Sequence, residues 1–279
     1  MLKIPVLLND NNYYFLLTNN FSIRIEIFSS NKIVINNITN NNYDMRNYDD
    51  KNKYGRIYVV ATPIGNLEDI TLRALKILRE VDFVICEDTR VTKILFDHYS
   101  IQKKFVVVNA NNEEHQIEKI LQEIKSGFTC ALVSDAGTPL ISDPGSKLLN
   151  EAVKNKITIV PVPGPSAITT ALSISGLPSS SFVFEGFLPQ KKGRQKKLQE
   201  LAEEERTIVI YESMYRIKKL IEELKYFMPD RPIVVARELT KKFEEIWRGT
   251  PEEILKDFDK KIIKGEFVII IAPKNFSNL

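Results

Sequence analysis

The chain has 279 residues, of which 43% are hydrophobic and 27% charged, and its formal net charge is +3. These values are typical of a globular protein and exclude the disordered and fibrous classes. No run reaches the ~20 apolar residues that a membrane helix needs, and no signal-peptide pattern opens the chain, which predicts a cytoplasmic protein. Two cysteines inside apolar runs and two histidines show no ligand spacing, so no metal is expected.

Residues 1–53 differ from the rest, because asparagine makes up about a quarter of them. Phe21–Phe28 and Lys32–Ile38 alternate like strands, but no glycine or proline turn separates them. Such polar bias is typical of a segment that adds little to a packed core. We therefore predict an appendage. Because Met45 stands ten residues before the regular pattern begins, a mis-assigned start is our hypothesis, which N-terminal sequencing of the native protein would decide.

Residues 54–177 have the pattern of a doubly wound α/β domain. Amphipathic stretches, of which Glu113–Ser126 is the clearest, alternate with apolar runs, and this predicts right-handed crossovers between parallel strands. The runs suit strands buried on both faces of a mostly parallel sheet. They are Ile57–Ala61, Phe83–Glu87, Phe105–Asn109, Cys130–Asp135 and Thr158–Val162.

Residues 178–274 predict a smaller C-terminal α/β domain, followed by a tail at 275–279. Arg216–Met228 has one apolar stripe and predicts a helix. A second helix should begin at Thr250, with Pro251 in its first position and Glu253 completing a capping box. The expected strands are Phe182–Phe187, Thr207–Tyr211, Ile233–Arg237 and Phe267–Ile271.

Every predicted strand of the first domain runs into an unusual loop at its carboxyl end, the edge where open α/β sheets bind ligands. The longest loops are Thr62–Asp69, Ser134–Gly145 and Pro161–Ala167. Their glycines allow close approach of a ligand to the backbone, and their prolines keep them rigid. Neither a phosphate-binding Gly-x-x-x-x-Gly-Lys motif nor a dinucleotide Gly-x-Gly-x-x-Gly motif is present. A small adenosine-like ligand held by main chain is therefore expected.

At these loops the sequence resembles the ribosomal RNA small subunit methyltransferase I family, which has the two-domain tetrapyrrole methylase fold. The resemblance implies a homodimer with S-adenosylmethionine between the domains. It also implies methylation of a cytidine 2′-hydroxyl at the decoding region of 16S ribosomal RNA in the small subunit. The matching segments follow in the family's order from Arg56 to Pro273: Val60–Thr71, Cys86–Arg90, Val133–Gly145, Val162–Ala167, Glu185–Pro189, Tyr211–Ser213 and Ala236–Lys241.

Two residues depart from the family pattern. Asn111 and Tyr215 stand where the family often has histidine. A 2′-hydroxyl reacts only once its proton leaves, so a carboxylate base is expected instead. The candidates are Glu113, which we favour over Asp88, and Glu87, with Arg90 able to hold a phosphate or to orient a carboxylate. The alternative for each carboxylate is that it caps a helix or pairs with an arginine.

The methyl donor is expected to meet backbone and small side chains of the strand-end loops. The residues predicted to contact the donor are Pro63, Asp135, Ala136, Gly137, Ser166 and Ala167. Ser166 can cap the helix predicted at Ala167–Ser175, whose first N–H groups would face the ligand. Asp135 either accepts from a polar group of the donor or tightens its own turn.

A basic run around Gly193 is the candidate RNA contact, because each phosphate that a cation neutralises adds salt-dependent affinity. It comprises Lys191, Lys192, Arg194, Lys196 and Lys197. The alternative is a solvated loop. Two other functions stay open. A methyltransferase of the same fold could act on a tetrapyrrole precursor or a protein side chain, although such relatives usually carry Gly-x-Gly-x-Gly-Asp after the first strand. The second of these alternatives is a non-catalytic RNA-binding assembly factor.

Overall fold

The computed structural model describes residues 6–9, 13–18, 21–27, 33–38, 54–109 and 112–276, and only the backbone of the first four segments, Glu113 and His115. Residues 1–52 and 53–279 form separate compact units, and each is described by itself. Met45, the hypothetical start, lies outside the described residues. In the described part of the chain, no helix has the length and apolar character to cross a bilayer.

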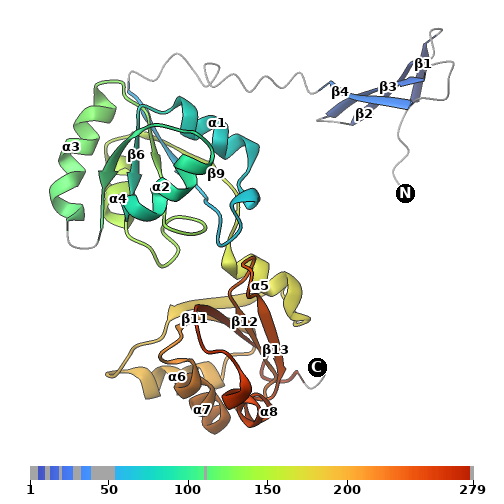
Figure 1. Ribbon diagram of the computed structural model, residues 1–279, viewed down its shortest axis with the longest axis vertical. Helices are drawn as coiled ribbons and strands as arrows, with labels where there is room; N and C mark the ends of the chain where they lie inside the picture. Colours follow the sequence, from blue (N-terminus) through green and yellow to red (C-terminus); the bar gives the residue numbers. More distant parts are fainter. Residues whose placement is uncertain are drawn as a thin grey trace. The chain divides into compact units, whose positions relative to one another are not determined.

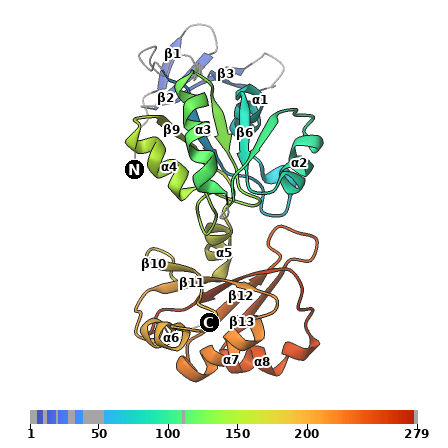
Figure 2. The ribbon, with the colours of Figure 1, turned by 90° about the vertical axis from the view of Figure 1, so that its left-hand side faces the viewer.

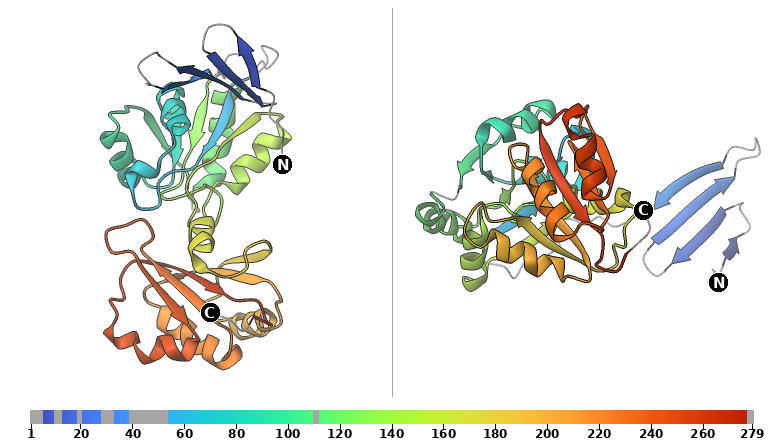
Figure 3. Two further views of the ribbon diagram at one scale, coloured as in Figure 1. Left: turned by 90° about the vertical axis from the view of Figure 1, so that its right-hand side faces the viewer. Right: turned by 90° about the horizontal axis from the view of Figure 1, so that it is seen from below.

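The N-terminal unit is an antiparallel sheet in which each strand pairs with the next along the chain (Figure 3). Two of its strands coincide with the runs that alternate in the sequence. Its four strands are β1 (Val6–Asn9), β2 (Tyr13–Thr18), β3 (Phe21–Ile27) and β4 (Ile33–Ile38).

The first sheet of the larger unit is wholly parallel, in the order β7-β6-β8-β5-β9. The predicted doubly wound fold is thus confirmed. Strands β6 and β8 are short and completely buried, which explains their all-apolar sequences. The strands are β5 (Arg56–Val60), β6 (Phe83–Cys86), β7 (Lys104–Val107), β8 (Cys130–Leu132) and β9 (Thr158–Val162).

Helices cover both faces of this sheet (Figure 2). The chain steps outward from β5 through β6 to β7, and then returns to β8. Right-handed crossovers therefore place the first two helices on one face and the next two on the other. Ile120 and Ile124 of the third helix pack with Leu148 of the fourth in one core cluster. The helices are α1 (Leu72–Glu80), α2 (Thr89–His98), α3 (Glu113–Lys125) and α4 (Ser146–Lys154), and a short 3₁₀ turn, η2 (Leu67–Asp69), precedes α1.

The second sheet is mixed, in the order β10-β11-β14-β12-β13, with only β10 and β11 parallel. Residues on its strands alternate between two cores. Ile208 and Ile210 face one cluster, whereas Val209 faces the other. The strands are β10 (Phe182–Phe187), β11 (Thr207–Ser213), β12 (Ile233–Arg237), β13 (Glu245–Gly249) and β14 (Glu266–Ile271).

Helix α5 (Ala167–Ser175) directly follows the first sheet but packs on the second (Figure 1). Its Ile168, Ala171 and Leu172 share a core cluster with residues of β11, β12 and β14. The opposite face of the second sheet is covered by α6 (Arg194–Ala202), α7 (Ile217–Phe227), α8 (Pro251–Lys256) and the 3₁₀ turn η3 (Phe258–Lys260). The boundary predicted near residue 178 stays a prediction.

Helix α8 begins as its sequence predicts. The Thr250 hydroxyl accepts a hydrogen bond from the Glu253 N–H, the Glu253 carboxylate accepts from the Thr250 N–H, and Pro251 occupies the first turn. Two otherwise unsatisfied donors are thus paired at the helix end.

Candidate active site

The loops after the parallel strands converge at one edge of the first sheet. Thr62, after β5, and Gly137, after β8, exchange backbone hydrogen bonds of 2.9 and 3.0 Å. The Thr62 hydroxyl also donates to the Ser134 carbonyl at 3.1 Å. The Thr138 hydroxyl donates at 3.2 Å to the carbonyl of Pro165, in the loop after β9. Three loops far apart in the sequence therefore form one connected wall.

This wall lines a cavity of about 550 Å³ between the two sheets. Such a volume lies within the ~300–1,000 Å³ usual for small-molecule sites. Five of the six residues expected to meet the donor line it: Asp135, Ala136, Gly137, Ser166 and Ala167. Pro63 is buried and does not border the cavity, so the structure gives it a place behind the wall.

Gly137 shows why this loop needs glycine. Its φ is +81°, a conformation that side chains with a β-carbon rarely adopt. A β-carbon there would also lie 3.2 Å from the Ile64 side chain. The loop continues through Leu140 and Ser142, whose φ values are +74° and +71°. Backbone strain of this kind is held in place by surrounding structure and often occurs at ligand sites.

The second sheet supplies the opposite wall, which sequence reasoning did not include. It is built from the ends of β10, β11 and β14 and from the loop after β12. Its lining residues include Phe187, Tyr211, Met214, Tyr215, Leu239, Lys241 and Glu266. Several belong to the segments that carry the family resemblance, and this was the signal that could have identified them.

Two close approaches join the walls at their edges. A β-carbon on Gly65, after β5, would lie 2.7 Å from Thr240 Oγ1 and 2.8 Å from the Leu239 carbonyl. A β-carbon on Gly186, in β10, would lie 3.0 Å from the Ser142 hydroxyl. At Gly65 a side chain would press on the Leu239 backbone, and Gly186 has a φ of +60°, so glycine is favoured at both contacts.

Two carboxyl groups of the first wall, and Glu87, which does not border the cavity, resist ionisation. Burial raises the pKa of Asp143, which borders the cavity, and the nearby Asp135 carboxylate adds to the rise. The pKa of Asp135 is raised as well, mainly by burial and also by Asp88. Burial raises the pKa of Glu87, with Asp135 and Asp143 contributing. A cation bound between these groups would favour their charged forms.

Asp88 and Arg90 form a tight local pair. The Arg90 guanidinium donates to both carboxylate oxygens of Asp88, which also accepts the Arg90 N–H as the cap of α2. These bonds lower the pKa of Asp88 to about 2. The Asp88 N–H donates to the Asp135 carboxylate at 3.3 Å, so the pair borders the site through Asp135. The Asp88 side chain thus does what the alternative interpretation expected, because it caps a helix and pairs with an arginine.

Ser166 occupies the N-cap position of α5, as expected, but its side chain forms no capping hydrogen bond. The expectation of a side-chain cap is therefore wrong in this detail. Ser166 and Ala167 border the cavity. Helix α5 thus begins at the cavity, where the N-terminal end of the helix dipole favours negative or lone-pair-bearing groups.

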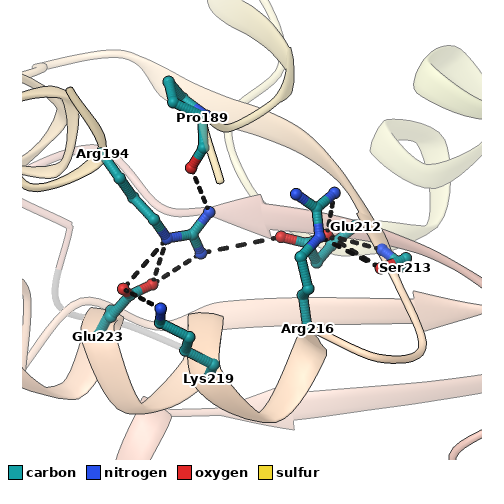
Figure 4. A network of polar contacts seen from close by, with 7 residues as sticks. All are labelled: Pro189, Arg194, Glu212, Ser213, Arg216, Lys219 and Glu223. Atoms are coloured by element: carbon teal, nitrogen blue, oxygen red, sulfur yellow. Dashed lines mark hydrogen bonds and ion pairs between the residues drawn. The ribbon is translucent and has the colours of Figure 1, made fainter. Parts of the chain in front are cut away.

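Arg194 differs from the expectation that it contacts RNA. Its side chain is 4% exposed and lies 2.7 Å from the Glu223 carboxylate of α7. It also donates to the Pro189 carbonyl and lies 3.8 Å from Glu212 (Figure 4). Glu212 pairs in turn with Arg216 at 2.8 Å. Because its guanidinium is buried and bonded to other residues of the protein, we no longer count Arg194 among the candidate RNA contacts.

The four lysines of the basic run are not equivalent. Lys197 pairs with Glu185 at 2.7 Å, and Lys196 lies 3.9 Å from Glu200. Lys191 and Lys192 are exposed and form no ion pair with any residue that the structure describes. They remain the stronger candidates for phosphate contacts. The side chain of Glu113, the favoured base, lies outside the described residues, although its backbone opens α3.

Residues 56–255 match the family model of the tetrapyrrole (corrin/porphyrin) methylases. The chain is 45% identical over 220 residues to a ribosomal RNA small subunit methyltransferase I from Thermotoga maritima, a match that covers 79% of this chain and 99% of that protein.

Solved structures show the same fold at lower identity. One is the cobalamin biosynthetic enzyme cobalt precorrin-4 methyltransferase, at a TM-score of 0.61 and 20% identity, covering 78% of this chain and 94% of that one. Another is uroporphyrin-III C-methyltransferase from Thermus thermophilus complexed with S-adenosyl homocysteine, at 0.56 and 20%, covering 78% and 97%. The chain belongs to the tetrapyrrole methylase family and, within it, to the ribosomal RNA small subunit methyltransferase I family.

Proposed function

We propose that the protein transfers a methyl group from S-adenosylmethionine to the 2′-hydroxyl of a cytidine in 16S ribosomal RNA of the small subunit. The observation that carries this proposal is the 45% identity, over nearly the whole length of the relative, to a protein named for small-subunit ribosomal RNA methylation. A cavity between the two sheets, bordered by the strand-end loops, supports it.

The residues of the first wall fit the donor. S-adenosylmethionine supplies an electrophilic methyl group on a positively charged sulfur. Asp135 and Asp143 border the cavity, and burial raises the pKa of both carboxyl groups. A cationic ligand would favour their charged forms. Small Ala136 and Gly137 and the first turn of α5 leave main-chain groups open to the polar parts of the ligand.

We rank the candidate bases by their pKa shifts. Asp88 is a poor base, because Arg90 lowers its pKa to about 2. Glu87 is better suited, since its pKa is raised and a base works best when its pKa approaches the working pH. Glu113 and Glu87 are therefore the two proposed bases, with Arg90 orienting Asp88. Glutamine at the true base should lower kcat at least tenfold, with little change in donor affinity.

The RNA partner is proposed to meet Lys191 and Lys192. Their charges are not used within the described part of the chain, and they lie in the loop that leaves the second wall. Following the family resemblance, we also propose a homodimer that works in the cytoplasm. Light scattering of the full chain should give twice the 32.1 kDa monomer mass, and the monomer mass alone would overturn the dimer.

Transfer of a tritiated methyl group tests the proposed function. The full chain is incubated with labelled S-adenosylmethionine and either purified small subunits or naked 16S RNA, and the labelled nucleotide is then mapped. We expect label on a cytidine ribose. Label on a base would overturn the 2′-O assignment. No label in either RNA would overturn the function, and label on a tetrapyrrole precursor or a protein would support a same-fold alternative.

A further inference from the structure

Two exposed aromatic rings stand at the second wall of the cavity. Phe187 ends β10 and is 52% exposed, and Tyr215, in the loop between β11 and α7, is 85% exposed. Both border the cavity. We call these two side chains the aromatic lip. Large exposed aromatic side chains beside a cavity mark a surface that a partner covers.

Phe187 is held in place on its inner side. Its ring centroid lies 5.8 Å from that of Tyr211, and the Arg216 guanidinium carbon lies 6.0 Å from the Phe187 centroid. Tyr211 is in turn held by Phe184, with centroids 5.0 Å apart and the planes at 71°. This support orients the Phe187 ring without covering its outer part.

Tyr215 makes no aromatic or cation–π contact with another residue that the structure describes. The backbone of its loop is nevertheless anchored. The Arg216 N–H donates to the Ser213 carbonyl at 3.0 Å, and the Arg216 side chain pairs with buried Glu212 at 2.8 Å. The polar network of Figure 4 therefore anchors the loop that carries Tyr215.

The two walls differ in chemistry. The first wall has small residues, carboxyl groups and the start of α5, which suit the donor, whereas the second has the aromatic rings, together with aliphatic side chains and the charged Lys241 and Glu266. In methyl transfer the acceptor must face the donor across the site. The acceptor therefore meets the aromatic wall.

We propose that Phe187 and Tyr215 stack against the base of an acceptor nucleotide that has been drawn out of its strand. This rests on the proposed function and adds how the RNA is held. When a nucleotide leaves the base stack to bring its ribose into a cavity, aromatic rings replace the missing stacking. The cavity of about 550 Å³ must also hold the donor, so only part of its volume is open to the acceptor.

Charge on the same segment favours a nucleic acid as the occupant. Lys191 and Lys192 follow Phe187 by four and five residues, and both are exposed and without an ion pair among the described residues. Rings that stack bases beside cations that meet the phosphates are the pattern of single-strand binding sites. A base on the aromatic lip would leave the adjacent phosphates near this loop.

The test compares Phe187→Ala, Tyr215→Ala and Tyr215→Phe with Tyr226→Ala, in the full chain. Tyr226 is an 80% exposed tyrosine of α7 that does not border the cavity, so it is the matched control. KM and kcat for small subunits are measured by methyl transfer, and donor affinity by calorimetry.

Each alanine variant at the lip should raise the KM for RNA about tenfold, the effect expected when one ring no longer stacks on a base, without changing donor affinity. Tyr215→Phe keeps the ring and should recover most of this effect, and Tyr226→Ala should match the wild type. An unchanged KM in both alanine variants, or an increase in Tyr215→Phe as large as in Tyr215→Ala, would overturn the stacking role. Absence of methyl transfer by the wild type would instead overturn the proposed function. Methyl transfer to a tetrapyrrole that both alanine changes reduce would show that the aromatic lip holds a tetrapyrrole and not a base.

Discussion

Thr62 and Gly137 are hydrogen-bonded to each other in both directions, although 75 residues separate them. This bridge joins the loops after β5 and β8, which are neighbouring strands of the first sheet. Gly137 takes part with a φ of +81°. The wall of the cavity therefore depends on one residue without a side chain.

Gly137→Ala should weaken donor binding about tenfold, equivalent to about 1.4 kcal/mol, because the added carbon strains the backbone and presses on Ile64. Gly193→Ala is the matched control. Gly193 has a φ of +85°, and nothing lies within 4 Å of an added β-carbon. Both variants should lose ~1–2 kcal/mol of stability from the left-handed backbone. Calorimetry with S-adenosylmethionine should separate them, and equal donor affinities would contradict the role of Gly137.

Arg194→Met should lower the free energy of unfolding by about 3–5 kcal/mol, because it leaves the carboxylate of Glu223 buried without its partner. Adding Glu223→Met should restore part of the stability. Lys196→Met, at a side chain that is 82% exposed, should change stability by less than ~0.5 kcal/mol. Urea denaturation measures all three. Similar small effects of the two single variants would show that the Arg194 network is not structural.

Lys191→Ala with Lys192→Ala should reduce the salt dependence of RNA binding. The slope of log affinity against log salt should fall in magnitude by roughly 1.4–1.8, at ~0.7–0.9 for each phosphate that is no longer neutralised. Lys196→Ala with Lys197→Ala removes the same charge from side chains that already face carboxylates, so its slope should change less. If both pairs shift the slope equally, the run acts only through its net charge.

Asp143→Asn should raise Tm at pH 7. Because burial raises the pKa of Asp143, the folded protein keeps this proton at pH values where the unfolded chain has released it. Stability therefore falls as pH rises from the ordinary carboxyl pKa through the raised value, and stays lower above it. Asparagine removes this part of the decline, so the variants should converge near pH 3, where the carboxyl is protonated in both states.

Thermal scans from pH 3 to 8 check this expectation. Asp230→Asn, at an exposed position between α7 and β12, is the control and should track the wild type throughout. A constant Tm difference between Asp143→Asn and the wild type at every pH would mean that proton binding is not its cause.

The first sheet could be predicted because its strands are nearly all apolar in sequence, and β6 and β8 are buried along their whole length. Strand β13 was missed for the opposite reason. It lies at the edge of the second sheet, and Glu245 and Arg248 give it no apolar alternation. Pairing with β12 stabilises it, and pairing is a tertiary property that local pattern does not contain.

The site divides in the same way. Asp135 and Gly137 could be chosen from sequence because they stand in a glycine-rich loop directly after a strand. Burial of Arg194 depends on Glu223, 29 residues away on another helix, and no local feature distinguishes it from its lysine neighbours. The second wall could not be predicted from the sequence either. Strands β10, β11 and β14 become neighbours only through the strand order of the mixed sheet.

Gly65 leaves no room for even a methyl group against Thr240 and the Leu239 carbonyl, and both Glu238 and Thr240 have positive φ. Beside the cavity, the backbone of the first wall thus lies directly against the Leu239 carbonyl and the side chains of Thr240 and Lys241. Any larger residue at position 65 would push the two walls apart. The distance between a donor on the first wall and an acceptor on the second would then increase.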